Sequence, residues 1–318
     1  MLKRLLSLLG FGWLLYTTAA ATESAGIHLI HGVTTAGAQP DGNSVILDAP
    51  QGLIVFDTGR HTAHTQEIID FAKAAEKPVV AIINSHWHLD HVGGNLMLRA
   101  EYPDVHVYAS SALEGALGGF LARYREQLEQ AIAHAEKDPQ AQASMRAEMT
   151  LIDAGPRLAP TDVVTQSGVR VVAGRELEFH LERAAVTAGD LWVLDRKSRT
   201  LLAGDLVTLP APFLDTACPP RWQAALAELS RANFKRLIPG HGAALDRHGL
   251  ATYRRAFDAL LRCAASQREK GECVDGWLRD AGSLSPEGDR GYARSLLDYY
   301  MDQVLRGHED KLAQLCAS

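Results

Sequence analysis

The sequence predicts an α/β fold in which strands and helices alternate and several neighbouring strands pair as hairpins. The chain has 318 residues, of which 47% are hydrophobic, so it can bury a sizeable core. Apolar runs of strand length recur between residues 27 and 241, and segments with helical spacing of apolar residues separate them. Turn residues join several pairs of these runs, which is typical of hairpins.

The first residues predict a targeting segment. Lys3 and Arg4 precede an apolar run, and Ala19-Ala20-Ala21 fits a cleavage site of small residues. We therefore expect residues 1–21 to be a signal peptide, since the apolar run is too short for a comfortable membrane span. An uncleaved anchor is the alternative. Cleavage of residues 1–21 takes away two positive charges and changes the net charge of the chain from −6 to −8.

The mature chain is accordingly expected to be periplasmic or secreted, with no stable membrane insertion. Its mild acidity gives no reason to expect nucleic acid or an anionic membrane as a partner. Four cysteines remain, which permits two disulfides in an oxidising compartment, with three possible pairings. Three of the four lie in the last 56 residues, so we expect disulfides to link the C-terminal helices; the four are Cys218, Cys263, Cys273 and Cys316.

The elements of the first half follow from their apolar spacing. Residues 43–59, "NSVILDAPQGLIVFDTG", hold two β-branched runs around a Pro-Gln-Gly turn and predict a hairpin. Residues 64–76 have helical spacing. Residues 78–85, "PVVAIINS", form a continuous apolar run, as expected of a strand that is covered on both faces. A short helix over 93–103 and a strand over 105–110 complete this half.

The second half begins with a predicted helical insertion over about 111–149, which breaks at Asp138-Pro139. Strands return over 162–183 with a turn at Ser167-Gly168, and residues 188–207 predict another hairpin. An amphipathic helix and a short strand follow, and the strand ends in a Gly-His-Gly loop. The remainder is predicted to be two or three helices separated at 271–276 and 282–291. We therefore expect a main domain over 22–247 and a C-terminal helical extension over 248–318.

Residues 84–95, "NSHWHLDHVGGN", place three histidines and an aspartate within six positions. They are His86, His88, Asp90 and His91. Imidazole nitrogen and carboxylate oxygen are ligands that suit Zn²⁺. The cluster begins where a buried strand ends, which is where open α/β sheets place their sites. One loop with this spacing can supply ligands to two neighbouring metal ions, so the sequence predicts a metal site.

With this motif the chain resembles the metallo-β-lactamase superfamily, whose signature is His-x-His-x-Asp-His after a buried strand. The likeness covers about residues 27 to 245. The fold of that superfamily, an αββα sandwich, is therefore expected here. "LLAGDLV" resembles the segment that carries the aspartate bridging two metal ions, here Asp205, and "LIPGHG" resembles the segment with the last ligand, here His241. The resemblance implies one metal ion held by Asp90, His91, Asp205 and His241.

The second metal ion would be held by His86, His88, Asp205 and a third histidine, and at that last position the sequence departs from the pattern. The segment reads "VTAGD", so Val186 occupies the ligand position. Three interpretations follow: a weakly held ion completed by water, a substitute ligand, or a site with one metal ion. His180 is the nearest upstream histidine, but six extended residues span roughly 20 Å, which argues against it as the substitute.

The resemblance implies a zinc-dependent hydrolase in which metal-bound hydroxide attacks a carbonyl of an ester, thioester or amide, with two zinc ions if the Val186 site is tolerated and one otherwise. Asp90 would also orient the hydroxide. Asp57, in the Asp-Thr-Gly turn, and Asp190 are predicted to brace the ligands, although a turn-capping role explains either as well. The substrate is an unidentified small molecule.

Within the superfamily, the secretion signal, "SHWHLDHVGGN" and the cysteine-bearing helical tail resemble the SoxH-related zinc metallohydrolases. Some of these are named for quinoprotein relay systems, which implies a periplasmic quinoprotein system as a possible partner. A β-lactamase acting on β-lactam antibiotics is one alternative, although Asp at the position of Asp205 is typical of thioesterase-like members. A persulfide dioxygenase would need the histidine that Val186 replaces. A non-catalytic metal-binding relic of the fold is the alternative that Val186 favours.

Overall fold

The computed structural model describes residues 26–33, 39–135, 138–307 and 309–317. The predicted signal peptide, residues 1–21, lies outside the described residues. Among the residues that are described, no helix combines the length and the apolar composition needed to cross a bilayer.

The first sheet contains six strands in the spatial order β1-β2-β3-β4-β5-β6. β1, β2 and β3 pair antiparallel, and β3 to β6 pair parallel. The predicted hairpin over 43–59 is confirmed as β2 and β3, and the buried run over 78–85 as β4. The strands are β1 (Ile27–Ile30), β2 (Ser44–Ala49), β3 (Gly52–Phe56), β4 (Val79–Ile83), β5 (His106–Ala109) and β6 (Asp162–Val163).

The second sheet has the order β11-β10-β9-β8-β7. β7 to β10 pair antiparallel, whereas β11 lies parallel to β10. The predicted turn at Ser167-Gly168 is wrong, because β7 begins at Gly168 and the chain turns at Ala173 and Gly174, whose φ angles of 50° and 81° suit a tight hairpin. The strands are β7 (Gly168–Val172), β8 (Arg175–Glu182), β9 (Asp190–Asp195), β10 (Thr200–Thr208) and β11 (Arg236–His241).

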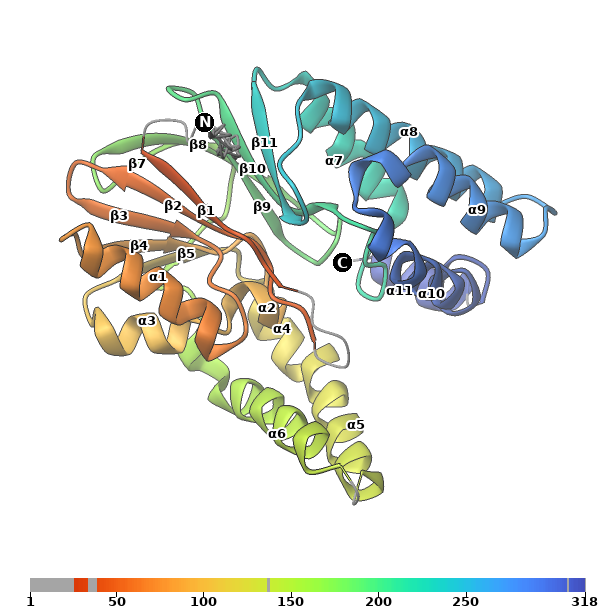
Figure 1. The fold of residues 1–318 in the computed structure, drawn as a ribbon, viewed down its shortest axis with the longest axis horizontal. Coiled ribbons are helices and arrows are strands. Elements are labelled where there is room, and N and C mark those ends of the chain that lie inside the picture. The colour runs from red at the N-terminus through yellow and green to blue at the C-terminus, as the bar shows by residue number, and fades with distance from the viewer. Residues whose placement is uncertain (1–25, 34–38, 136–137, 308, 318) are drawn as a thin grey trace, which may run out of the picture.

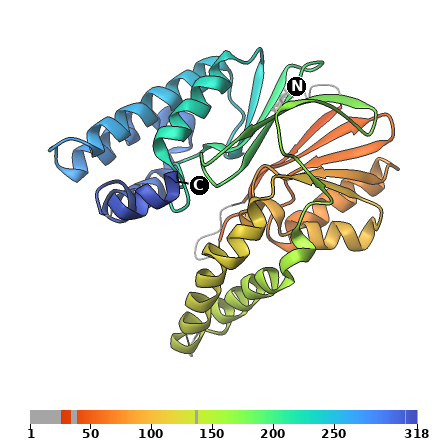
Figure 2. The same cartoon turned by 180° about the vertical axis from the view of Figure 1, so that it is seen from behind.

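Helices cover the outer faces of both sheets (Figures 1 and 2). The α-helices are α1 (Thr62–Ala74), α2 (Leu89–Val92), α3 (Asn95–Glu101), α4 (Ala112–Gly118), α5 (Phe120–His134), α6 (Pro139–Ala154), α7 (Pro219–Arg231), α8 (Arg247–Ala264), α9 (Lys270–Asp280), α10 (Arg290–Tyr300) and α11 (Glu309–Cys316). Shorter helical turns are η1 (Gly155–Leu158), η2 (Gly282–Leu284), η3 (Glu287–Asp289) and η4 (Met301–Leu305).

Three layers of buried side chains establish the αββα sandwich. One layer lies between the first sheet and α1 and α3, and includes Ile68 and Leu98. A second joins the inner faces of the two sheets, where Ile54 and Phe179 are both fully buried. The third lies between the second sheet and α7 to α10, and includes Trp222. Helix, sheet, sheet and helix therefore follow one another, as predicted.

The helical insertion begins at α4 and runs through α6, so it ends at Ala154, five residues beyond the predicted 111–149. Its helices project away from the sandwich (Figure 1). Leu113, Leu121 and Leu128 of the insertion pack with Trp87 and Leu89 of the histidine-rich segment. The insertion therefore supports the outer side of that segment.

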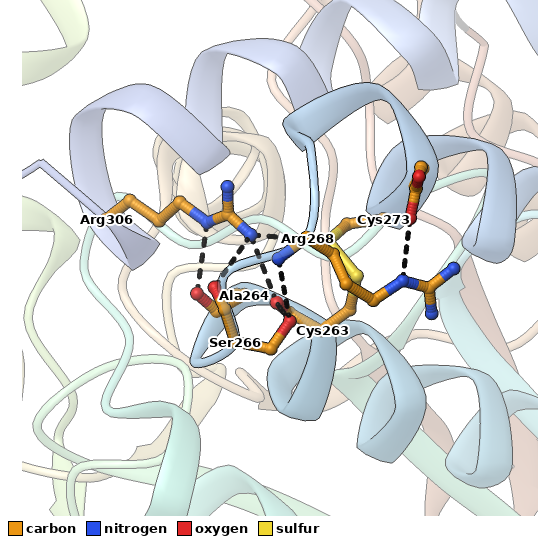
Figure 3. The surroundings of a disulfide bond; sticks show 7 residues. Cys263, Ala264, Ser266, Arg268, Cys273 and Arg306 are labelled. Carbon is orange, nitrogen blue, oxygen red and sulfur yellow. Dashed lines mark hydrogen bonds and ion pairs between the residues drawn. A yellow bond between two sulfur atoms is a disulfide. The ribbon is translucent and has the colours of Figure 1, made fainter.

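The C-terminal extension comprises α8 to α11 and two disulfides. The predicted break at 271–276 is wrong, because those residues lie within α9. Cys263–Cys273 joins α8 to α9, and the Arg306 guanidinium donates to the carbonyl oxygens of Cys263 and Ala264 beside it (Figure 3). Cys218–Cys316 joins the start of α7 to α11. Disulfides thus link the C-terminal helices to one another and to the sandwich.

Candidate metal centre

The six predicted ligands come from one loop and two strands. The loop that follows β4 carries His86 and His88 and leads into α2, which carries Asp90 and His91. β10 carries Asp205, and β11 ends at His241. Because these strands run parallel side by side, Asp205 and His241 come together at one end of the sandwich.

Two glycines allow the strands and the loop to approach closely. A Cβ at Gly240 would lie 2.0 Å from Asp205 Oδ1, and a Cβ at Gly204 would lie 2.4 Å from Ser85 Cβ. Gly204 also has a φ of 51°, in the left-handed region that glycine adopts readily. The glycines of "LLAGDLV" and "LIPGHG" are therefore required to seat the aspartate.

The ligand atoms form two groups, each of which fits within 4.8 Å: one with His86, His88 and Asp205, the other with Asp90, His91 and His241. Asp205 lies between the groups. Its Oδ2 is 3.8 Å from His86 Nε2, whereas its Oδ1 is 3.3 Å from His91 Nε2 and 3.6 Å from His241 Nε2. The arrangement suits an aspartate shared by two metal ions.

The chemistry of these atoms fits a metal ion. His86 Nε2, His91 Nε2, His241 Nε2 and both carboxylate oxygens of Asp205 are buried, and none has a hydrogen-bond partner among the described residues. Buried polar atoms are normally hydrogen-bonded, so five orphaned atoms at one place need another partner. Nitrogen and carboxylate oxygen together are a donor set that suits zinc.

Asp57 braces the second group from behind. Its Oδ2 lies 2.8 Å from His91 Nδ1 and accepts from Ser85 Oγ at 2.7 Å, and its Oδ1 accepts from the Ser85 backbone N–H. Ser85 Oγ also lies 2.9 Å from His86 Nδ1. Asp57 is fully buried and has a φ of 57°, a strained conformation for most residues. The Nε2 atoms of both histidines are thereby directed toward the metal centre.

Thr216 was missed by sequence reasoning, and it orients His88. Its hydroxyl donates to the Val186 carbonyl oxygen at 2.9 Å and lies 3.0 Å from His88 Nε2. Since the single hydroxyl hydrogen is directed to Val186, the hydroxyl accepts from His88 Nε2–H. This contact leaves His88 Nδ1 without a proton and able to bind a metal ion. No local sequence pattern marks Thr216.

Val186 is fully buried in the apolar layer between the second sheet and α7 to α10, together with Trp192 and Leu206. Asp190 accepts from the backbone N–H groups of Val186 and Thr187 and from the Thr187 hydroxyl. Burial is the largest effect on Asp190 and raises its pKa to about 7. Asp190 therefore holds the turn that contains Val186, which is the turn-capping role; its bracing of the metal ligands stays a prediction.

Arg60 is a second residue that sequence reasoning missed. Its guanidinium lies 3.3 Å from Asp90 Oδ1 and donates to Glu148 of α6, and its side chain is 9% exposed. The residue follows the Asp-Thr-Gly turn directly, so a cation after that turn is the signal that could have identified it. Arg60 ties Asp90 to the helical insertion and fixes one of its oxygens.

The electrostatics of the centre favour neutral histidines and ionised carboxylates at most of the ligands. Burial lowers the pKa of His86 well below its usual value and that of His88 to about 4. Burial opposes ionisation of Asp90 and Asp205, but His91 and the other neighbouring cations outweigh it and hold both pKa values well below the usual range. The pKa of His91 is raised, because three carboxylates outweigh its burial.

His180 does not replace the missing ligand. It lies on β8, stacks on Trp192 with 3.6 Å between ring centroids, and has its Nε2 3.1 Å from Glu178 Oε1. It belongs to neither group of ligand atoms.

A pocket of about 260 Å³ lies beside the ligands His88 and Asp90. α5 of the insertion and α10 of the extension both contribute to its lining. A substrate in this pocket would therefore contact ligands from both groups.

The sequence profile of the metallo-β-lactamase superfamily matches residues 39–265. A linear primary-alkylsulfatase from Pseudomonas sp. is 26% identical over 219 residues, which cover 62% of this chain and 40% of that protein. A hydroxyacylglutathione hydrolase from Synechococcus sp. is 44% identical over 54 residues, or 17% of this chain and 21% of that protein. The chain thus spans less than half the length of these curated relatives.

Solved structures agree on the fold. A metallo-β-lactamase from Pontibacter korlensis aligns with a TM-score of 0.53 at 22% identity, covering 74% of this chain and 96% of that one. An inverting sec-alkylsulfatase from Pseudomonas sp. aligns with a TM-score of 0.55 at 21% identity, covering 86% of this chain and 49% of that one. The profile match extends over most of the chain, and we conclude that this protein belongs to the metallo-β-lactamase superfamily, whose members are metal-dependent hydrolases.

Proposed function

We propose that this protein is an exported zinc-dependent hydrolase that cleaves an ester, thioester or amide of a small molecule. The observation that carries the proposal is a set of five buried ligand atoms, three histidine nitrogens and the two carboxylate oxygens of Asp205, without hydrogen-bond partners among the described residues. Bound zinc supplies a Lewis acid and lowers the pKa of a coordinated water to near neutrality.

The chain's own residues hold the reacting groups in place. Asp90 Oδ2 lies 3.0 Å from His241 Nε2, while Arg60 fixes the other oxygen of Asp90. Asp90 borders the pocket, so its ionised carboxylate can accept a hydrogen bond from a water molecule and orient it toward a substrate carbonyl. His88 borders the same pocket, which brings the substrate to both ligand groups.

The two ligand groups are expected to differ in their affinity for zinc. Asp90, His91 and His241 form a complete set with Asp205, whereas His86 and His88 lack a third histidine because Val186 supplies no donor. We therefore propose one tightly held zinc ion at the complete set and a weaker one beside His86 and His88. Asp205 serves both ions.

The predicted signal peptide and the disulfides support the proposed compartment. Cys218–Cys316 and Cys263–Cys273 are compatible with an oxidising environment. Export to the periplasm, and action beside a quinoprotein system as in the SoxH-related subgroup, are parts of the proposal. Mass spectrometry of the mature protein tests export directly: we expect cleavage after Ala21, and an intact N-terminus would contradict it.

Hydrolysis is tested with the zinc-loaded mature chain against three reporters: a thioester, an ester and a β-lactam. We expect turnover of the thioester or ester, which chelation of zinc abolishes and Asp205→Asn reduces by more than about 100-fold. Turnover of the β-lactam alone would instead assign the protein to the β-lactamases. Absence of turnover with all three, combined with activity in Val186→His, would identify the chain as a relic.

A further inference from the structure

The pocket beside the ligands is walled by two segments that lie far apart in the sequence. Phe120 and Tyr124 of α5 line one side, and Tyr292 and Leu296 of α10 line the other. The helical insertion and the C-terminal extension flank the end of the sandwich at which α2 lies (Figure 1). The two segments outside the sandwich therefore determine what fits next to the metal centre.

The wall is mainly aromatic and aliphatic. Trp87, between two ligands, is 7% exposed and packs its ring 5.6 Å from that of Phe120. Phe213 also lines the pocket, and its ring centroid lies 5.5 Å from that of the His241 ring. Aromatic side chains of this kind bury large apolar area against a bound group. The pocket thus offers apolar contact within reach of the ligands.

The charges on the wall do not favour an anion. Among the described lining residues Arg60 is the only lysine or arginine, and two carboxylates already share its guanidinium. Asp215 also lines the pocket, and the hydroxyls of Tyr299 and Tyr300 donate to its carboxylate at 3.2 and 3.3 Å. Away from the metal centre, where the scissile carbonyl would sit, a carboxylate on the substrate would meet Asp215 and no unshared lysine or arginine among the described lining residues.

We infer that the pocket selects substrates that carry an uncharged apolar group, an aromatic ring or a short alkyl chain, next to the scissile carbonyl. The inference rests on the proposed hydrolase function. The pocket volume of about 260 Å³ exceeds the ~150 Å³ cavity that accepts benzene, so a substituted ring fits. Thioesters with acidic acyl groups, by contrast, are poor substrates.

The test compares three S-methyl thioesters with the same leaving group and different acyl groups: acetyl, phenylacetyl and succinyl. With the zinc-loaded mature chain, we expect kcat/KM for phenylacetyl to exceed that for acetyl by about 10- to 100-fold, the range expected for burial of one ring. We expect succinyl to fall below acetyl. Equal values for all three would overturn the inference and leave the hydrolase function standing.

Two neighbouring residues on α10 provide a matched pair of variants. Leu296→Trp fills the pocket and is expected to reduce the phenylacetyl-to-acetyl ratio by about tenfold or more. Ser295→Trp places the same side chain at an exposed position of the same helix and should leave the ratio unchanged. If Leu296→Trp does not fold, Tyr292→Ala replaces it as the pocket variant. This substitution, at a side chain that is 38% exposed, is also expected to reduce the phenylacetyl-to-acetyl ratio. A ratio that neither pocket variant alters would overturn the assignment.

Binding separates this inference from the proposed function. Phenylacetone is an uncharged ketone that cannot be hydrolysed, and its binding is measured by calorimetry. If the chain hydrolyses none of the three reporters but binds phenylacetone, and Leu296→Trp abolishes the binding while Ser295→Trp does not, the pocket assignment is supported although the hydrolase proposal fails. Absence of saturable binding to the wild-type protein together with absence of acyl selectivity would overturn the assignment.

Discussion

Thr216 Oγ1 lies 3.0 Å from His88 Nε2, although the two residues are 128 positions apart in the sequence. The hydroxyl also donates to Val186, so it holds the proton of His88 on Nε2 and leaves Nδ1 for a metal ion. We predict that Thr216→Val weakens binding of the weaker zinc ion by about 10- to 100-fold, the usual effect of losing such a partner. Competition with a chromophoric chelator measures this affinity. Thr216→Ser keeps the hydroxyl and should retain the affinity; an equal loss in both variants would contradict the account.

Asp57 provides a second prediction, for the tightly held ion. Asp57→Asn removes the carboxylate that lies 2.8 Å from His91 Nδ1, while Asn tolerates the φ of 57° at this position. We expect about 10- to 100-fold weaker zinc binding with little loss of folding. The same chelator competition provides the affinity, and circular dichroism checks the fold. Unchanged zinc affinity in a folded variant would exclude Asp57 as a positioning residue.

His64 predicts a pH dependence of folding stability. Its side chain is buried with Nε2 2.7 Å from Ser44 Oγ, and burial lowers its pKa despite the nearby carboxylates. As the pH falls below 6.5, His64 therefore binds more protons in the unfolded state than in the folded state. The free energy of unfolding consequently decreases toward acid pH. We predict that His64→Gln reduces the loss of stability between pH 7 and pH 5. Urea unfolding of the zinc-free protein at both pH values measures this difference in the free energy of unfolding.

The matched control for this experiment is His134→Gln, at an exposed position on α5. It should lose as much stability between the two pH values as the wild type. A His64→Gln variant that behaves like this control would show that His64 does not contribute to the acid lability.

The disulfides predict unequal effects on stability. Cys218–Cys316 closes a loop with a sequence separation of 98, whereas Cys263–Cys273 closes one of 10. Loop-closure entropy gives about 4.7 kcal/mol for the first and about 2.7 kcal/mol for the second. We therefore expect replacement of the first pair by alanine to lower the free energy of unfolding more than replacement of the second. Urea unfolding of the two double variants tests the order, and the reverse order would contradict this entropic explanation.

The sequence predicted the parts of the fold and site that local pattern determines. The six ligands are recognised because they lie in three short segments, and each segment follows or contains a strand. Thr216 could not be predicted in the same way, because its partners lie on other elements and no spacing rule connects them. The place of Arg60 after the Asp-Thr-Gly turn offered a signal, but its partner Glu148 on α6 did not follow from the sequence. The pocket likewise depends on α5 and α10, which come to line the same space only in the folded chain.

The predicted break at 271–276 was wrong for a related reason. Gly271 and Gly276 have low helix propensity, but α9 continues through both. Val274 and Trp277 of this helix are buried against the second sheet's outer layer, and Trp277 Nε1 donates to the Pro210 carbonyl oxygen. Tertiary packing and the adjacent disulfide therefore outweigh the local preference.

Zinc content per chain, determined by elemental analysis after dialysis against metal-free buffer, distinguishes one tightly held ion from two. We expect about one retained zinc ion in the wild type and about two in a folded Val186→His variant, since histidine completes the second set of ligands. Two ions in the wild type would contradict the role assigned to Val186. No retained zinc in either protein would contradict the metal centre itself.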